Sequence, residues 1–249
     1  MLPILFQSHN LILYSYPLLM GLGWGVAYQI FFSLIPPSIP RWQAQILFWG
    51  IFIFAWLGAK ILFLLTLSSA VSSGLLATSS FWTGGGFVFY GGLIAGFLFV
   101  LLYRLSGLTL NLATFWAIVP ALTFGHAIGR LGCFLAGCCY GQETSWWWGM
   151  YLHQAWRHPT QLIEALSLLA LGFYLLKSRK ERPRLMSHYL IFYGIIRLVV
   201  EALRGDSIRG EWAGLSPSQW ISLCLISIGL TMRFLKFKKL STVFTKIIK

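Results

Sequence analysis

The 249-residue sequence has little charge and very little acid. Aspartate and glutamate together number 6, against 19 lysines and arginines, and charged residues make up only 10% of the chain. Soluble domains carry roughly 25% charged residues. With 57% hydrophobic residues and a mean hydropathy of +0.74, this composition excludes an ordinary soluble domain and indicates an integral membrane protein.

Targeting signals and repeats are also missing. Residues 1–10 contain no positive n-region and no small-residue cleavage site, so we expect the apolar run after them to be a span and not a removed signal peptide. The C-terminus carries no lipidation motif. Without a repeat or a long linker, the simplest interpretation is one polytopic membrane domain over 1–249, of which 236–249 form a basic cytoplasmic tail.

Long apolar runs are what the chain does contain. One transmembrane helix needs about 20 mostly apolar residues, and seven runs approach or exceed that length. They lie at 11–35, 44–66, 87–103, 110–132, 159–177, 187–204 and 216–235. The predicted fold is therefore an all-α integral membrane protein with about seven transmembrane helices.

The positions of the basic residues predict the orientation, because cytoplasmic loops carry an excess of lysine and arginine. The loops on one side of the seven spans hold thirteen basic residues, and those on the other side hold only Arg157, Arg204 and Arg209. We therefore expect the N-terminus outside, the C-terminus inside, and the loop 133–158 outside. This distribution also accounts for the net charge of +13, so no nucleic-acid partner is expected.

Arg130 is the first candidate for function, because it falls at the end of an apolar span. A charged residue near the bilayer centre costs about 2.5–3.5 kcal/mol on insertion scales and so needs a partner or a purpose. His126, Arg130 and Cys133 follow i, i+4, i+7 spacing and share one helical face as far as the helix continues. The glycines that follow predict that this helix ends near residue 132.

A second charged group lies in the sixth span. Arg197, Glu201 and Arg204 have i, i+4, i+7 spacing and would form a stripe on an otherwise apolar helix. Glu201 can neutralise one arginine, and the remaining guanidinium suits a phosphate that it grips bidentately. The alternative interpretation is an Arg–Glu pair that only fixes helix packing.

Polar residues in three other spans are weaker candidates. Gln161 and Glu164 share a face at the start of the fifth span, just after Pro159, which suits a first helical turn. Glu164 could be a counter-ion for the arginines or a proton acceptor, or simply an interfacial glutamate favoured by the helix N-terminus. Tyr16 and Tyr90 could each hydrogen-bond a headgroup, although an ordinary interfacial tyrosine would look the same.

Three of the four cysteines are close together in the sequence. Cys133, Cys138 and Cys139 form a C-x4-C-C cluster, whereas Cys224 stands alone in the last span. Structural zinc sites use four ligands with recognisable spacing. Even with His126 added, this set fits no standard pattern, so we expect neither a metal nor a cofactor. On the oxidising outer side a disulfide or simple packing is favoured, and a reactive thiol remains open.

Five stretches, in order along nearly the whole chain, resemble the bacterial prolipoprotein diacylglyceryl transferases. Residues 129–141 resemble the family signature Gly-Arg-x-x-Asn-Phe-x-Asn-Gly-Glu, and 89–94 resemble its Phe-His-Gly-Gly-Leu-Ile. Residues 158–165 resemble its His-Pro-Ser-Gln-Leu-Tyr-Glu-Ala. Residues 193–204 resemble its Tyr-Gly-x-x-Arg-x-x-x-Glu-x-x-Arg, and 215–223 its approach to the last helix.

The resemblance implies a seven-span enzyme of the bacterial cytoplasmic membrane with its active site toward the outer leaflet. The donor would be phosphatidylglycerol, and the acceptor the lipobox cysteine of a prolipoprotein. The resemblance implies catalytic roles for Tyr90, Arg130, Arg197 and Glu201. Membrane lipids would surround the enzyme. The resemblance implies that substrate is bound by Tyr16, Gly91, Gly92, His126, Gln161, Glu164 and Arg204.

The chain also departs from the family pattern. Tyr90 stands where the family has a histidine, Cys133 and Ala136 replace two asparagines, and Cys138 replaces the glutamate of the signature. The base that would take the acceptor thiol's proton is therefore open. The candidates are Tyr90, Glu201, Glu164 and His126.

Two other functions stay open at this point. A diverged phospholipid-dependent transferase could serve another acceptor, with Cys138 or Cys139 as nucleophile. A non-catalytic lipid-binding or transport protein is the second alternative, although transporters often show paired repeats, which this sequence lacks.

Overall fold

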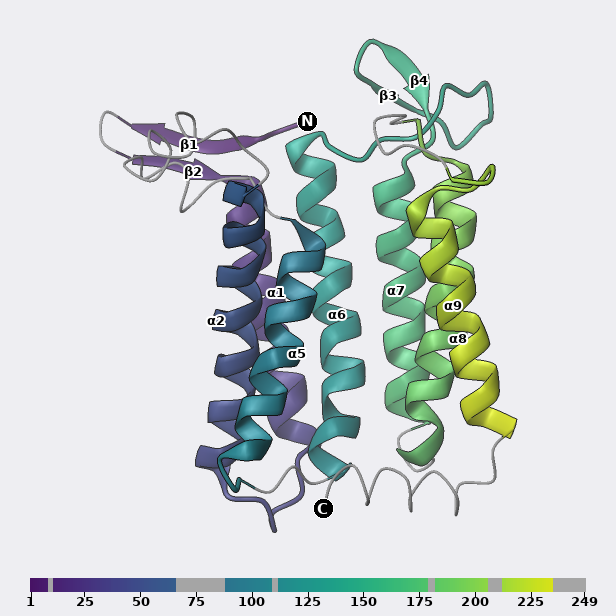
Figure 1. Ribbon diagram of the computed structural model, residues 1–249. Helices are drawn as coiled ribbons and strands as arrows, with labels where there is room; N and C mark the ends of the chain where they lie inside the picture. Colours follow the sequence, from purple (N-terminus) through teal and green to yellow (C-terminus); the bar gives the residue numbers. More distant parts are fainter. Residues whose placement is uncertain (9–10, 66–87, 109–111, 179–181, 206–211, 235–249) are drawn as a thin grey trace. The chain divides into compact units, whose positions relative to one another are not determined.

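The computed structural model describes residues 1–8, 11–65, 88–108, 112–178, 182–205 and 212–234, and in these ranges it contains seven α-helices and two β-hairpins (Figure 1). The helices are α1 (Ser15–Leu34), α2 (Arg41–Leu65), α5 (Phe89–Leu105), α6 (Leu112–Ala136), α7 (Thr160–Lys177), α8 (Arg182–Ala202) and α9 (Pro217–Phe234). The strands are β1 (Ile4–Ser8), β2 (Leu11–Tyr14), β3 (Met150–Leu152) and β4 (Ala155–Arg157).

Each predicted span contains one helix, which confirms the helical class. Within the described residues, five helices are long and apolar enough to cross a membrane: α1, α2, most of α6, α7 and most of α8. Gly91–Leu105 of α5 is a shorter apolar helix. The chain is therefore a helical membrane protein, whereas the count of seven spans and the orientation stay predictions. The predicted tail, 236–249, lies outside the described residues.

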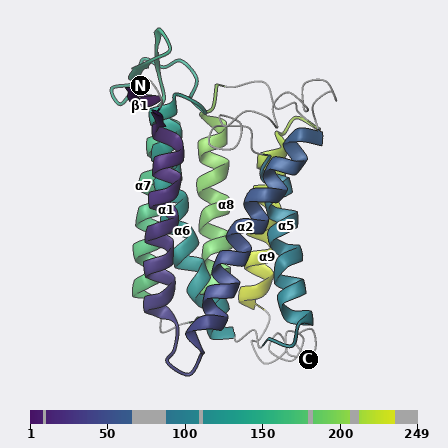
Figure 2. The same cartoon turned by 90° about the vertical axis from the view of Figure 1, so that its left-hand side faces the viewer.

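The N-terminal segment differs from the prediction. The first span was expected from residue 11, but β2 occupies Leu11–Tyr14 and pairs antiparallel with β1. Ser15 begins α1, and both its N–H and its hydroxyl donate to the carbonyl oxygen of Pro3, at 3.0 and 3.2 Å. These two bonds tie the hairpin to the start of the helix, and β1 lies at the end of α1 in Figure 2. The apolar run before Ser15 is therefore extended and not helical.

Helix α6 is longer than predicted. It continues four residues past the expected end at 132, because its glycines serve packing against α1 and do not end the helix. A Cβ added at Gly132 would lie 3.3 Å from both the Leu19 Cβ and the Tyr16 ring. The helix instead ends where Gly137 adopts a left-handed φ of 79°, a conformation that glycine takes without a steric penalty.

The helices form two compact units, one of Leu34–Thr114 and the other of Met1–Ser33 with Phe115–Lys249. In the first of these, α2 packs along α5. A Cβ on Gly91 would lie 2.2 Å from the carbonyl oxygen of Gly58, so the two backbones touch. The Tyr103 hydroxyl donates to the carbonyl oxygen of Gln43 at 3.1 Å and joins the two helices farther along.

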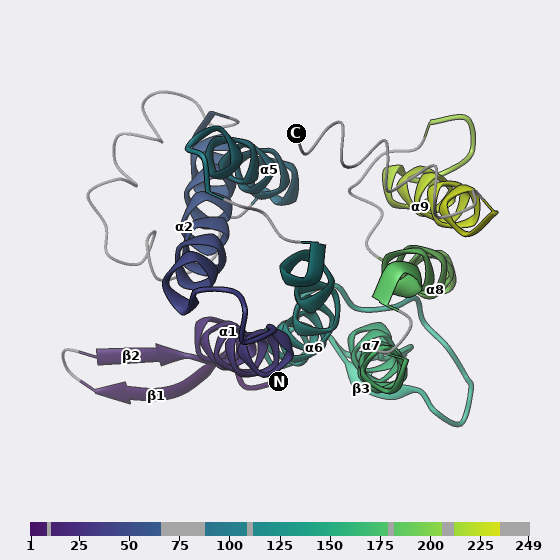
Figure 3. The ribbon, with the colours of Figure 1, turned by 90° about the horizontal axis from the view of Figure 1, so that it is seen from below.

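The larger unit holds the remaining helices, which follow one another in the order α1, α6, α7, α8, α9 when seen along their axes (Figure 3). α1 and α6 cross closely at Gly23 and Gly125, where a Cβ on Gly23 would lie 2.8 Å from the Gly125 carbonyl oxygen. Small residues let membrane helices approach in this way. The crossing fixes α6, which carries Arg130.

The α1–α6 crossing predicts a position-specific effect of one substitution. Valine at Gly23 overpacks the crossing, which typically costs about 1–3 kcal/mol, so Gly23→Val should lower the thermal unfolding midpoint of the detergent-solubilised protein. Gly25→Val is the matched control, because nothing lies within 4 Å of a Cβ at Gly25. Equal midpoints for the two variants would contradict the close approach.

Candidate active site

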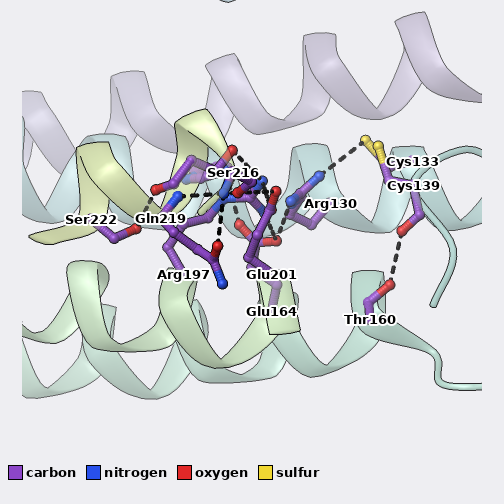
Figure 4. A network of polar contacts seen from close by, with 12 residues as sticks. Arg130, Cys133, Cys139, Thr160, Glu164, Arg197, Glu201, Ser216, Gln219 and Ser222 are labelled. Carbon is purple, nitrogen blue, oxygen red and sulfur yellow. Dashed lines mark hydrogen bonds and ion pairs between the residues drawn. The ribbon is translucent and has the colours of Figure 1, made fainter. Parts of the chain in front are cut away.

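Four charged side chains from three helices meet inside the larger unit (Figure 4). Arg130 comes from α6, Glu164 from α7, and Arg197 and Glu201 from α8. The Glu164 side chain is completely buried, and those of the other three are between 6% and 12% exposed. Buried ions need close partners, and each of these four has one.

Glu164 lies between two arginines. Its Oε2 accepts hydrogen bonds from Nη2 of Arg130 and from Nη1 of Arg197, the latter at 3.2 Å. Nη2 of Arg197 also donates to Oε2 of Glu201 at 2.6 Å, the i, i+4 contact that the spacing predicted. The result is an alternating chain, Arg130–Glu164–Arg197–Glu201, in which Glu164 has the counter-ion position rather than an interfacial one.

Two serines at the start of α9 complete the chain of contacts. The Ser216 hydroxyl donates to Oε1 of Glu201 at 2.9 Å, and Nη2 of Arg197 donates to the Ser218 oxygen at 3.2 Å. Neither serine was predicted as a site residue from the sequence. Serines at the start of an apolar helix are common caps, and only the charges on α8 give these two another role.

Within the described part of the protein, two atoms of the four charged side chains lack a hydrogen-bond partner. Nε of Arg130 and Oε1 of Glu164 are buried and have no hydrogen-bond partner among the described residues. Nε2 of His126 lies 3.8 Å from that Oε1, which is too long for a hydrogen bond. A buried, unpaired polar group costs about 1–3 kcal/mol, so the free N–H of Arg130 is suited to an anionic oxygen that arrives with a ligand.

Arg204 does not continue the helical stripe that the spacing predicted. α8 ends at Ala202, and Arg204 forms an isolated β-bridge with Gly141. The neighbouring Gln142 N–H donates to the carbonyl oxygen of Leu203 at 2.9 Å. Pairing with the segment after α6 thus replaces the last helical turn. It keeps Arg204 buried, at 7% exposure, and beside that segment.

The chain reverses direction directly after α6, in a turn that brings the thiols of Cys133, Cys138 and Cys139 together (the cysteine turn). Gly137 and Cys139 both have left-handed φ values, 79° and 64°, and the Cys138 N–H donates to the carbonyl oxygen of Cys133 at 3.1 Å. The sulfur atoms of Cys133, Cys138 and Cys139 lie within 4.8 Å of one another. They are free thiols, so of the two outcomes expected from the sequence, a disulfide or simple packing, the disulfide is not formed in this structure.

Two buried side chains of α7 hold this turn. The Thr160 hydroxyl donates to the carbonyl oxygen of Cys139 at 2.8 Å, and the Gln161 amide donates to that of Cys138 at 2.7 Å. Both side chains belong to residues that are only 1% exposed. Gln161, expected to bind substrate, thus positions the cysteine turn, although its Oε1 has no partner among the described residues.

Positive charge lies beside the thiols. Nη1 of Arg130 is 4.0 Å from the Cys133 sulfur. The pKa of the Cys139 thiol is lowered, first by hydrogen bonds with Cys133 and Cys138 and then by the charges of Arg204 and Arg130. The pKa of the neighbouring Cys138 thiol is instead raised, first by its hydrogen bonds with Cys133 and Cys139, so within the cluster negative charge is favoured on the Cys139 sulfur.

Two further predicted residues lie near this site. The Tyr16 ring packs against Gly132 of α6, between Arg130 and Cys133 in the sequence. His126 lies one helical turn before Arg130, and its ring meets that of Tyr193 edge to face at 5.5 Å. The structure thus groups these two with the charged chain.

Three predicted residues belong to the other unit. Tyr90, Gly91 and Gly92 lie in the first turn of α5, and the side chain of Tyr90 lies outside what the structure describes. Gly91 has a packing role against α2. Their parts in substrate binding or catalysis stay predictions from the resemblance.

Known proteins are similar to this chain over most of its length. A family model described as prolipoprotein diacylglyceryl transferase matches residues 3–235. The chain belongs to the prolipoprotein diacylglyceryl transferase family. Family membership agrees with the resemblance drawn from the five motifs, and the charged chain and the cysteine turn lie within the matched range.

Three relatives named phosphatidylglycerol–prolipoprotein diacylglyceryl transferase show the extent of the similarity. The Clostridium tetani protein is 40% identical over 157 residues, 59% of this chain and 63% of the relative. The second such transferase of Clostridium perfringens is 36% identical over 187 residues, 71% of this chain and 72% of the relative. The Streptococcus suis protein is 34% identical over 203 residues, 76% of this chain and 74% of the relative.

The position of Glu164 predicts a large loss of stability when its charge is removed. Glu164→Gln leaves Arg130 and Arg197 with only one carboxylate between them, and breaking a buried ion pair costs about 3–5 kcal/mol. Glu143→Gln is the matched control. Its carboxylate pairs with Arg157 at 2.8 Å but its side chain is 69% exposed, and an exposed pair contributes about 0–1 kcal/mol. Thermal unfolding midpoints in detergent compare the two variants. An equal, small decrease in both would contradict the counter-ion role.

Proposed function

We propose that the chain transfers the diacylglyceryl group of phosphatidylglycerol to the thiol of the lipobox cysteine of a prolipoprotein. The observation that carries this proposal is the buried chain Arg130–Glu164–Arg197–Glu201, found in a protein whose relatives are named for that reaction. The Nε–H of Arg130 has no hydrogen-bond partner among the described residues and is available to an anionic oxygen of the lipid.

The arginines are suited to the phosphate of the lipid donor. A guanidinium presents donors in a planar fork that matches two phosphate oxygens, and Arg130 and Arg197 bring two such groups to the same oxygen of Glu164. Arg204 adds a third buried guanidinium at the segment after α6. We assign Arg130 and Arg197 to the phosphate and Arg204 to the headgroup.

The reaction forms a sulfur–carbon bond and breaks a carbon–oxygen bond. The acceptor thiolate attacks the glyceryl carbon that carries the phosphate, and the electron pair of the broken bond stays on the phosphate oxygen of the departing glycerol 1-phosphate. Negative charge grows on that phosphate, so fixed guanidinium groups in a site with little water stabilise the transition state more than the ground state. Glu164 and Glu201 hold the arginines in place before the lipid binds.

We propose seven membrane spans with the N-terminus outside and the site facing the outer leaflet of the bacterial cytoplasmic membrane. The presence of one helix in each predicted span supports the count, and the distribution of basic residues supports the orientation. Trp146 and Trp147 in the segment after α6 are 59% and 87% exposed. Exposed tryptophans at that position suit the membrane–water interface.

The phosphate assignment predicts that Arg130→Ala abolishes transfer. Loss of one preorganised donor to developing charge typically lowers the turnover by a factor of about 10²–10³. The assay measures the diacylglyceryl mass shift of a lipobox peptide incubated with phosphatidylglycerol vesicles and the purified protein. Arg130→Lys, which keeps the charge but loses the fork, should fall between Ala and wild type.

Arg184→Ala is the control for this series, because Arg184 is an exposed arginine thirteen residues before Arg197 on the same helix. It should retain wild-type transfer. Thermal midpoints show which variants are folded. A folded Arg130→Ala protein that transfers diacylglyceryl at the wild-type rate would refute the mechanism. Failure of the wild-type gene to complement a strain lacking its own transferase would refute the function.

A further inference from the structure

The proposed reaction needs a thiolate, and the charged chain offers no obvious group to make one. An acceptor thiol has a reference pKa of about 8.5, and only its ionised form is strongly nucleophilic. Glu164 is held by two arginines, and Glu201 by Arg197 and Ser216. Both carboxylates are already engaged by these donors, so a group outside the charged chain is the better candidate to ionise the thiol.

The cysteine turn is a group of suitable chemistry beside the charged chain, with the Cys133 sulfur 4.0 Å from Nη1 of Arg130. Its three sulfur atoms lie within 4.8 Å of one another, and Zn–S bonds of about 2.3 Å in a tetrahedral site would place sulfurs about 3.8 Å apart. A closure of no more than about 1 Å therefore brings Cys133, Cys138 and Cys139 to one ion. Among the described residues, no histidine or acid joins this group as a fourth ligand.

The turn is built to hold its sulfurs in place. Cys139 has a positive φ, which is uncommon for a residue with a side chain, and the carbonyl oxygens of Cys138 and Cys139 are each fixed by a buried side chain of α7. Packing alone does not explain these constraints on the turn, because Cys138 is exposed and packs little. The arrangement resembles a preorganised set of ligands.

We propose that Cys133, Cys138 and Cys139 bind one Zn²⁺ whose fourth coordination position takes the acceptor thiol; this inference rests on the proposed function. Soft thiolates select zinc and similar ions, and a zinc site with three protein ligands and one open position is the arrangement found in catalysis. No metal was expected from the sequence, because structural zinc sites use four protein ligands. An open position removes that requirement.

The step balances without a redox partner. The acceptor thiol binds zinc as a thiolate, because a coordinating thiol is deprotonated outright, and its proton goes to water. The zinc-bound sulfur then attacks the glyceryl carbon, and glycerol 1-phosphate leaves with the electron pair of the broken carbon–oxygen bond. The product thioether is neutral and a weak ligand, so it leaves zinc for the next thiol.

The neighbouring charge fits an anionic zinc centre. Three thiolates and one Zn²⁺ carry a formal charge of −1, and the Arg130 guanidinium lies 4.0 Å from the Cys133 sulfur. The same guanidinium is assigned above to the lipid phosphate. One arginine would therefore lie beside both the zinc centre and the leaving phosphate, while the attacked glyceryl carbon lies between the nucleophile and the leaving group.

The first experiment measures metal. The full chain, purified in detergent without added chelator, should contain about one zinc per chain by elemental mass spectrometry. Cys133→Ser, Cys138→Ser and Cys139→Ser should each lose most of it. Cys224→Ser, the same substitution at an exposed cysteine on α9, should keep it. Zinc that is retained in all four variants, or absent from the wild type, would overturn the site.

The second experiment tests the open position. Cobalt replaces zinc in the stripped protein, and the thiolate-to-cobalt absorption should change when a lipobox peptide with cysteine is added but not when its serine analogue is added. Removal of zinc should abolish transfer, and added ZnCl₂ should restore it. These measurements do not depend on whether a serine variant folds. A cobalt spectrum unchanged by the cysteine peptide would overturn the open position.

The outcomes also separate this inference from the function it rests on. Transfer that proceeds in zinc-free protein and in the folded cysteine variants keeps the proposed function and refutes zinc activation. A disulfide among these cysteines, in protein purified without reductant and free of zinc, refutes the site as well. Bound zinc with a thiol-sensitive cobalt spectrum, but no transfer from phosphatidylglycerol, supports the metal site and refutes the proposed donor.

Discussion

The contact of Glu164 with two arginines is the constraint on which the site depends. A lone arginine at the depth of Arg130 would be costly in a membrane, and a second one on α8 would repel it. One buried carboxylate on the helix between them removes both difficulties. It also sets the spacing of the two guanidinium groups, so α7 acts as the template against which α6 and α8 place their charges.

Composition and run length were enough to predict the helices, because each span must bury its backbone in its own hydrogen bonds and be apolar throughout. They did not predict how the spans end. Leu11–Tyr14 is as apolar as a helix start but pairs with β1. Gly132 was expected near the end of the helix, but it lies inside α6, where α1 packs against it. In both cases the local sequence is compatible with either structure, and contacts with another part of the protein determine which one forms.

The same distinction applies to the site. The Arg197–Glu201 contact is local, at i and i+4, and its spacing predicted it. The bridge from Glu164 to both arginines joins residues more than thirty positions apart, so the sequence offered it only as one of several roles. Ser216 and Ser218 were not identified at all, because a serine acquires this role only from the charges it faces.

The turn after α6 links the parts of the site in space. Its backbone is bonded to Thr160 and Gln161 of α7 and, through Gly141, to the residues that follow α8. The cysteines and Arg204 are therefore placed by one short segment, and Arg130 lies on the helix that ends in it. A substitution that shifts this turn would move the thiols and a guanidinium together. Stability and chemistry are thus coupled here, which explains why the turn is fixed by buried side chains and not left to solvent.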